Sequence, residues 1–292
     1  MPSWQGKSKG TRFGYGVFIS ILRHWGLKPA YFLLKFVSFY YFLFSRQSSR
    51  AMISYFRRLG ITGIKAYRKL YRNYYLLGQT IIDRIVMLSG IPNRFTFDFD
   101  GEDILRRMVS MNKGGLLVSA HLGNWEIAGH LLKRLNTRVH IVMFDGEHQK
   151  LKEYLQSEAG ESAANIIVLR EDLSHIYAID EALKRNELVC MHADRFLEGN
   201  RIMPCQFLGG EANFPVGPFA LAYSFKVPVS FVFALKESDL HYHFFASPLI
   251  FAEEGNRNTQ VQSMMKAFVS ELEQKTLMYP EQWFNYYDFW QN

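Results

Sequence analysis

The chain has 292 residues, 48% of them hydrophobic, and a formal net charge of +7. This length and hydrophobic content allow a large buried core, which fits one catalytic domain with an appendage. Two cysteines, Cys190 and Cys205, exclude the disulfide framework of a small secreted protein and favour a reducing compartment.

Basic residues are concentrated at the N-terminal end. Residues 1–82 hold 14 of the 34 lysines and arginines and no acidic residue, because the first acidic residue is Asp83. The rest of the chain carries 20 basic and 27 acidic residues, a formal net charge of −7. Such a split is typical of a chain whose one end meets nucleic acid or an anionic membrane. Long apolar and aromatic runs between the charges argue against nucleic acid and favour the membrane.

Residues 30–45, AYFLLKFVSFYYFLFS, contain one charge, Lys35. As a helix they span about 24 Å, less than the ~30 Å hydrocarbon core of a bilayer. A longer segment that starts at Val17 crosses charges and the Gly26 to Pro29 break. Three possibilities stay open: a tilted span, a pair of interfacial helices broken near residues 26–29, and a helical hairpin on a soluble core.

Residues 54–88 place aromatic and cationic side chains at helical spacing, which predicts amphipathic helices at a membrane surface. The composition changes at residues 89–94, SGIPNR, which we take as a linker. The sequence therefore predicts a basic, apolar membrane-docking helical region over residues 1–89 and an α/β domain over residues 90–292.

Short apolar runs alternate with helical stretches after this linker, and the pattern predicts a mixed central sheet flanked by helices. The expected strands are residues 116–119, 139–143, 166–169, 188–192, 229–235 and 243–246. The expected helices are residues 102–111, 126–135, 148–157, 173–184, 218–225 and 258–278. Residues 193–213 are expected to form one long loop, whose length indicates a site.

Residues 116–126, LLVSAHLGNWE, hold the strongest chemical feature, because a strand runs into a turn with His121 and a helix begins near Glu126. On one continuous helix these two side chains would lie roughly 140° apart. A turn at Gly123 and a helix cap at Asn124 allow them to meet. His121 then serves as a general base oriented by Glu126, and N–H groups of the turn receive an oxyanion. The alternative is a structural histidine beside a capping-box glutamate.

HLGNWE resembles the His-x4-Asp/Glu motif of the lysophospholipid acyltransferase superfamily, in particular its lipid A lauroyl and myristoyl acyltransferase branch. Three further segments resemble that branch: the pattern Trp4, Gly6, Gly14 and Gly16, the run FLGGEANFPVGPFALA at residues 207–222, and YPEQWFNYY at residues 279–287.

The resemblance implies a fatty acyl group that passes directly from acyl carrier protein, or from CoA, to a hydroxyl of a lipid A precursor or related lipid. It implies His121 and Glu126 as the catalytic pair, with no cofactor and no metal. It also implies a place at the bacterial inner membrane, with the catalytic domain facing the cytoplasm.

MHADR at residues 191–195 resembles the family's strand that ends in Asp-Gln, with Arg195 in the place of the usual Gln. Sites collect at strand ends of α/β sheets, and arginine forks suit phosphate oxygens of an acceptor or a phosphopantetheine arm. A structural salt bridge at Asp194 and a solvated Arg201 are the alternatives. The expected substrate-binding residues are Gly123, Asn124, Asp194, Arg195, Arg201, Gly209 and Gly210.

The chain also departs from the family pattern, because residues 145–165 lack the arginine-rich helix and FNYYDFW replaces a basic, Trp-rich close. The acceptor thus stays open between a lipid A precursor, an amino-acid lipid and an aryl-polyene lipid.

Other classes fit less well. Cys190, His192 and Asp194 alternate along one strand as in a Cys-based transferase, although a thiol within LVCM is more often an inert core residue. The chain has neither a G-x-S-x-G elbow nor an H-E-x-x-H zinc motif. A membrane-docked lipid-binding protein with an aromatic groove is the non-enzymatic alternative.

Overall fold

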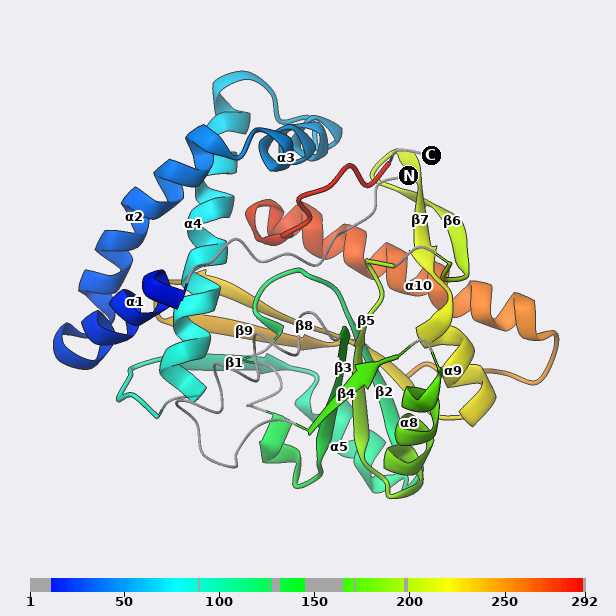
Figure 1. Cartoon of the computed structure of the whole chain (residues 1–292). Helices are drawn as coiled ribbons and strands as arrows, with labels where there is room; N and C mark the ends of the chain where they lie inside the picture. Colours follow the sequence, from blue (N-terminus) through cyan, green and yellow to red (C-terminus); the bar gives the residue numbers. More distant parts are fainter. Residues whose placement is uncertain are drawn as a thin grey trace.

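The structure is a computed structural model that describes residues 12–88, 90–125, 127, 132–144, 165–170, 172–196 and 199–290. It begins with the helices α1 (Arg12–Trp25), α2 (Leu27–Phe44), α3 (Arg46–Arg58) and α4 (Gly63–Leu88). In Figure 1 these helices gather on one side of the molecule, and α4 stands between α2 and the central sheet.

The sheet has seven strands in the order β1-β9-β8-β2-β5-β3-β4. Its neighbouring strands are parallel, except that β8 and β9 are antiparallel. The mixed sheet confirms the predicted fold class. The strands are β1 (Thr96–Asp100), β2 (Gly115–Ser119), β3 (Val139–Phe144), β4 (Asn165–Leu169), β5 (Leu188–His192), β8 (Val229–Ser238) and β9 (His241–Ala246).

Helices cover both faces of this sheet. Successive strand residues point to opposite faces, so Leu116 and Val118 join one core cluster and Leu117 joins another. Every residue of β2 is buried, as expected for a central parallel strand. The helical elements are α5 (Glu102–Ser110), η1 (Leu132–Leu135), α8 (Ser174–Lys184), α9 (Gly217–Phe225), α10 (Arg257–Met278) and η2 (Pro280–Gln282).

Among the described residues, three strands were not predicted. The expected loop over residues 193–213 contains an antiparallel hairpin of β6 (Ile202–Phe207) and β7 (Gly210–Pro215). Its two turn residues, Leu208 and Gly209, have positive φ angles of 49° and 69°, the backbone form that closes a tight hairpin. Leucine rarely adopts this left-handed conformation, so Leu208 does not indicate a hairpin turn in the sequence. No element was predicted for the residues of β1, where Phe97 and Phe99 alternate with exposed residues in the manner of a half-buried edge strand.

The N-terminal apolar segment is two helices, since Gly26, with a φ of 82°, separates α1 from α2. Among the described residues, no helix is both long enough and apolar enough to span a bilayer. The helix predicted at residues 148–157 lies outside the described residues. The boundary at residue 89 stays a prediction, and α3 and α4 contribute Met52, Tyr55 and Leu70 to the same core as β2.

A buried polar network joins the N-terminal helices to the sheet. Lys236 on β8 pairs with Asp83 on α4 at 2.5 Å, and the two side chains are 1% and 0% exposed. Asp83 also accepts hydrogen bonds from the hydroxyls of Tyr31 on α2 and Tyr242 on β9. Because its charges have left water, the network stabilises the fold only while every partner remains.

Lys236→Met is therefore expected to lower the free energy of unfolding by about 3–5 kcal/mol, because it leaves the buried carboxylate of Asp83 without its counter-ion. Lys184→Met is the matched control, since it removes an exposed ion pair with Asp180 and should cost at most about 1 kcal/mol. Urea unfolding followed by circular dichroism measures both. Equal losses in the two variants would contradict a structural role for the buried pair.

Candidate active site

Strand pairing brings His121 and Asp194 together from positions 73 residues apart. β2 and β5 are parallel neighbours in which Ser119 pairs with His192, so their carboxyl ends lie at the same edge of the sheet. His121 and Asp194 each follow two residues beyond that pair. The main chains stay joined there, because the Ala193 N–H donates to the carbonyl oxygen of Ser119 at 2.9 Å. This edge is where sites in α/β sheets usually form.

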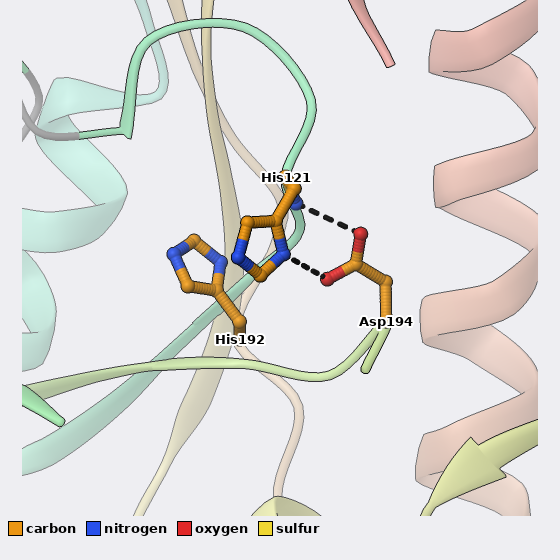
Figure 2. Close-up of side chains that lie close together, drawn as sticks. All are labelled: His121, His192 and Asp194. Carbon is orange, nitrogen blue, oxygen red and sulfur yellow. Dashed lines mark hydrogen bonds and ion pairs between the residues drawn. The ribbon is translucent and has the colours of Figure 1, made fainter. Parts of the chain in front are cut away.

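Asp194 holds His121 at two points, as Figure 2 shows. The Nδ1 atom of His121 lies 2.8 Å from Oδ1 of Asp194, and the His121 backbone N–H donates to Oδ2 at 2.9 Å. Trp283 donates its indole N–H to the same Oδ2 at 3.1 Å. Asp194 is 0% exposed, so these contacts replace water around its carboxylate.

The charge state of Asp194 decides the tautomer of His121. Burial by itself would raise the pKa of the Asp194 carboxyl, but the charge and hydrogen bond of His121, and then the charge of Arg195, hold that pKa well below its ordinary value. An ionised carboxylate only accepts hydrogen bonds, so Nδ1 of His121 carries the proton. Nε2 then keeps its lone pair, as a general base requires.

The turn after His121 is fixed on both sides. The Gly123 N–H donates to the Gln282 carbonyl at 2.9 Å, and the Asn124 N–H donates to the Ala234 carbonyl at 2.7 Å. Both N–H groups already donate to backbone carbonyls. The expectation that they donate hydrogen bonds to an oxyanion was therefore wrong. The Asn124 side chain also points inward, where its amide donates to the Thr80 carbonyl and the Tyr242 hydroxyl.

Gly123 is required by the turn itself. Its φ is +76°, and a Cβ atom added there would lie 2.0 Å from the carbonyl oxygen of Ala234. Any larger residue would push the turn away from β8 and move His121 with it. The prediction of a sharp turn at Gly123 is therefore confirmed, although its role is to position His121.

The C-terminal segment supports the site, which the sequence did not indicate. The Phe284 N–H donates to the His121 carbonyl at 2.8 Å, and Trp283 lies antiparallel to Leu122. Trp283 is fully buried, and Tyr287 donates its hydroxyl to the Asp194 carbonyl at 3.1 Å. The run YPEQWFNYY was noticed only for its resemblance, and a buried Trp beside polar groups was its one local signal.

His192 completes the described cluster. Its ring lies 4.4 Å from the ring of His121, and the ring of Trp125 packs edge-on against it at 4.7 Å. Neither of its shielded ring nitrogens has a hydrogen-bond partner. Among the described residues, His121, His192 and Asp194 form a group whose ligand-type atoms lie within 4.8 Å of one another. Asp194 and Nδ1 of His121 are already bonded to each other, and the absence of a metal stays a prediction.

Comparison with protein families decides the class. The family model described as bacterial lipid A biosynthesis acyltransferase matches residues 74–291. The chain belongs to this family. It is an acyltransferase that acts on lipid-type acceptors.

Other comparisons add less. A comparison with curated proteins finds no match. Among solved structures, the chain is similar to the 1-acyl-sn-glycerophosphate (LPA) acyltransferase PlsC from Thermotoga maritima. That likeness has 14% identity and a TM-score of 0.39, and it covers 84% of this chain and 97% of the other.

The other residues that were predicted to form the site do not all lie beside His121. Glu126, the expected partner of His121, lies outside the described residues. Asp194 was expected to shape the substrate groove, but its full burial and its bonds to His121 give it a positioning role. Arg195 donates to the Phe284 carbonyl at 2.6 Å, which ties the strand end to the C-terminal segment.

The hairpin residues have no described contact with His121. Arg201 is exposed and lies 3.4 Å from the Asn258 side chain, and Gly209 occupies the exposed hairpin turn. A Cβ atom on Gly210 would lie 2.2 Å from the Arg58 guanidinium, so Gly210 allows close packing of the hairpin on α3. Substrate binding by these three residues stays a prediction.

Cys190 is not a nucleophile in this acyltransferase. Its side chain is buried in the core, and burial raises the pKa of its thiol to about 12. The thiol therefore stays protonated near neutral pH, which contradicts the alternative of a Cys-based transferase.

Proposed function

We propose that this enzyme is an O-acyltransferase that moves a fatty acyl chain from acyl carrier protein, or from CoA, to a hydroxyl of a lipid A precursor or related lipid. The observation that carries the proposal is His121, whose Nδ1 is held by buried Asp194 while its ring remains partly exposed at the sheet edge. That arrangement creates a base beside a place where a hydroxyl can approach.

The reaction then needs one proton carrier. Nε2 of His121 takes the proton of the acceptor hydroxyl as its oxygen attacks the thioester carbonyl carbon. Collapse of the tetrahedral intermediate breaks the carbon–sulfur bond, and the departing thiolate takes the proton from His121. Asp194 stabilises the imidazolium that exists between these steps. Glu126 was expected to orient His121 and stays part of the proposed catalytic pair through the His-x4-Glu motif, and no cofactor takes part.

We propose that the N-terminal helices dock the enzyme on the cytoplasmic face of the bacterial inner membrane. One face of α2 packs on α4, whereas its outer face exposes aromatic and apolar side chains. Exposed Lys28 and Lys35 lie on the same helix. An apolar face with nearby cations fits an anionic lipid surface, along which α2 lies rather than crossing it. The side chains at least half exposed are Phe32, Phe36, Phe39, Tyr40, Leu43 and Phe44.

Membrane docking predicts that Phe32→Ser combined with Phe36→Ser lowers binding to vesicles of anionic phospholipid by at least roughly tenfold, because two large rings no longer enter the interface. Sedimentation of the purified enzyme with vesicles measures the effect. Tyr177→Ser, which removes an exposed ring from α8, is the control and should bind normally. Unchanged binding by the double variant would contradict this orientation of α2.

The function is tested by incubation of the purified enzyme with a labelled dodecanoyl thioester of acyl carrier protein and total bacterial membrane lipid. Mass spectrometry is expected to find the label in an ester of a membrane lipid. A parallel reaction with dodecanoyl-CoA compares the donors, and an acidic carrier protein suits the basic surface. Labelled free fatty acid without acylated lipid would indicate a thioesterase and contradict the proposal. Lipid binding without turnover would favour the non-enzymatic alternative.

A further inference from the structure

His192 is a polar side chain without polar partners at the centre of the site. Both ring nitrogens are shielded from water and accept or donate no hydrogen bond. Native proteins pair nearly all buried polar groups, because an unpaired one destabilises the fold. Its ring packs on the rings of His121 and Trp125. An apolar ring could fill the same space without leaving a buried polar group unpaired.

His192 and His121 lie close enough for both side chains to contact the same substrate molecule. In Figure 2 the His192 ring lies on the side of His121 that faces away from Asp194, and the second ring nitrogen of His121 is turned toward it. The centroids of the two imidazole rings lie 4.4 Å apart. A base nitrogen and an oxyanion donor need a comparable separation, because the attacking oxygen and the oxyanion bond to the same carbon and each lies about 3 Å from its partner.

Acyl transfer also needs a donor that the turn does not supply. The oxygen of a thioester carbonyl gains negative charge when the hydroxyl attacks, and N–H groups aimed at it lower the barrier. The backbone N–H groups of Gly123 and Asn124 are already bonded to Gln282 and Ala234. His192 is adjacent to the base, and no described side chain accepts a hydrogen bond from its imidazole N–H.

We propose that the N–H of His192 donates a hydrogen bond to the carbonyl oxygen of the acyl thioester and stabilises the oxyanion during transfer. This proposal rests on the proposed function and adds a further catalytic residue to it. The acceptor oxygen forms its bond to the carbonyl carbon while His121 takes its proton, and the carbonyl π electrons become the oxyanion held by His192. The carbon–sulfur bond then breaks, the double bond returns, and His121 protonates the thiolate.

His192 has the charge state that this role requires. Burial, and next the nearby charge of His121, lower the pKa of His192 well below its ordinary value, whereas Asp194 acts in the opposite direction. The ring is therefore neutral near pH 7, with one nitrogen that donates and one that accepts. A neutral His192 also avoids repulsion with the imidazolium that forms on His121.

His192→Phe tests the proposal, because it keeps a ring against Trp125 and removes the N–H. With dodecanoyl acyl carrier protein and total membrane lipid, kcat is expected to fall about 10²–10³-fold while KM changes less than threefold. His192→Asn, which restores an N–H donor of similar reach, should recover at least tenfold of that loss. A purely structural role would instead affect thermal stability and would not separate donor from non-donor variants.

A second experiment covers the case in which His192→Phe does not fold. His192→Ala opens the space of the ring, and added imidazole is expected to raise its kcat at least tenfold. A kcat of His192→Phe within threefold of the parent enzyme, or His192→Ala that imidazole does not rescue, would overturn the proposal. Loss of activity in His121→Ala would stand in either case, so failure here is separate from failure of the proposed function.

Discussion

Replacement of His121 with alanine is expected to lower the rate of acyl transfer roughly 10²–10⁴-fold, the usual contribution of a general base. The loss should appear in kcat, because no other described group beside the site is positioned by Asp194 to take the hydroxyl proton. The effect is measured as the rate of free thiol release from dodecanoyl acyl carrier protein in the presence of total membrane lipid.

Binding separates an enzyme from a lipid-binding protein in the same experiment. His121→Ala should sediment with anionic vesicles as the parent enzyme does, because α2 is unchanged. His241→Ala serves as the control, since His241 pairs with Asp98 on the edge strand β1 and has no described contact with His121. Full turnover by His121→Ala would remove the base from the mechanism and leave the family membership intact.

Asp194→Asn is expected to lower kcat about 10²–10⁴-fold without loss of the fold. The amide oxygen can still accept from the His121 backbone and from Trp283, which turns the NH2 group toward Nδ1 of His121. An amide donor at Nδ1 moves the imidazole proton to Nε2, which then has no lone pair for the acceptor hydroxyl. The enzyme would hold the right geometry with the wrong tautomer.

Nitrogen-15 NMR of the imidazole distinguishes this tautomer change from a general disturbance. The parent enzyme should show His121 protonated at Nδ1, and Asp194→Asn should show it protonated at Nε2. Asp180→Asn removes a surface carboxylate paired with Lys184 and should leave both kcat and the tautomer unchanged. An Asp194→Asn variant with kcat within threefold of the parent would show that Asp194 does not set the state of His121.

The elements most fully predicted from the sequence are those with strong local signals. Residues 188–192 form β5 as predicted, and α10 differs by one residue from the predicted helix at 258–278. Apolar runs of strand length and apolar residues at helical spacing can be recognised in the order of residues along the chain. The hairpin β6–β7 was missed because its turn uses Leu208 in a left-handed conformation, where the surrounding contacts outweigh the preference of the residue.

The sequence by itself predicted an α/β fold, a basic N-terminal region and His121 in a turn after a buried strand, and its resemblance to a known family predicted an acyltransferase. The first three follow from charge distribution, periodicity and the spacing of residues 116–126, and the activity follows from the resemblance. Only the tertiary structure decided which described group orients His121, because strand pairing brings Asp194 to it and the returning C-terminal segment brings Trp283 to Asp194. These neighbours are set by the register of β2 on β5 and by the contact of the Gly123 turn with β8. Neither the register nor this contact can be predicted from the order of residues in one chain.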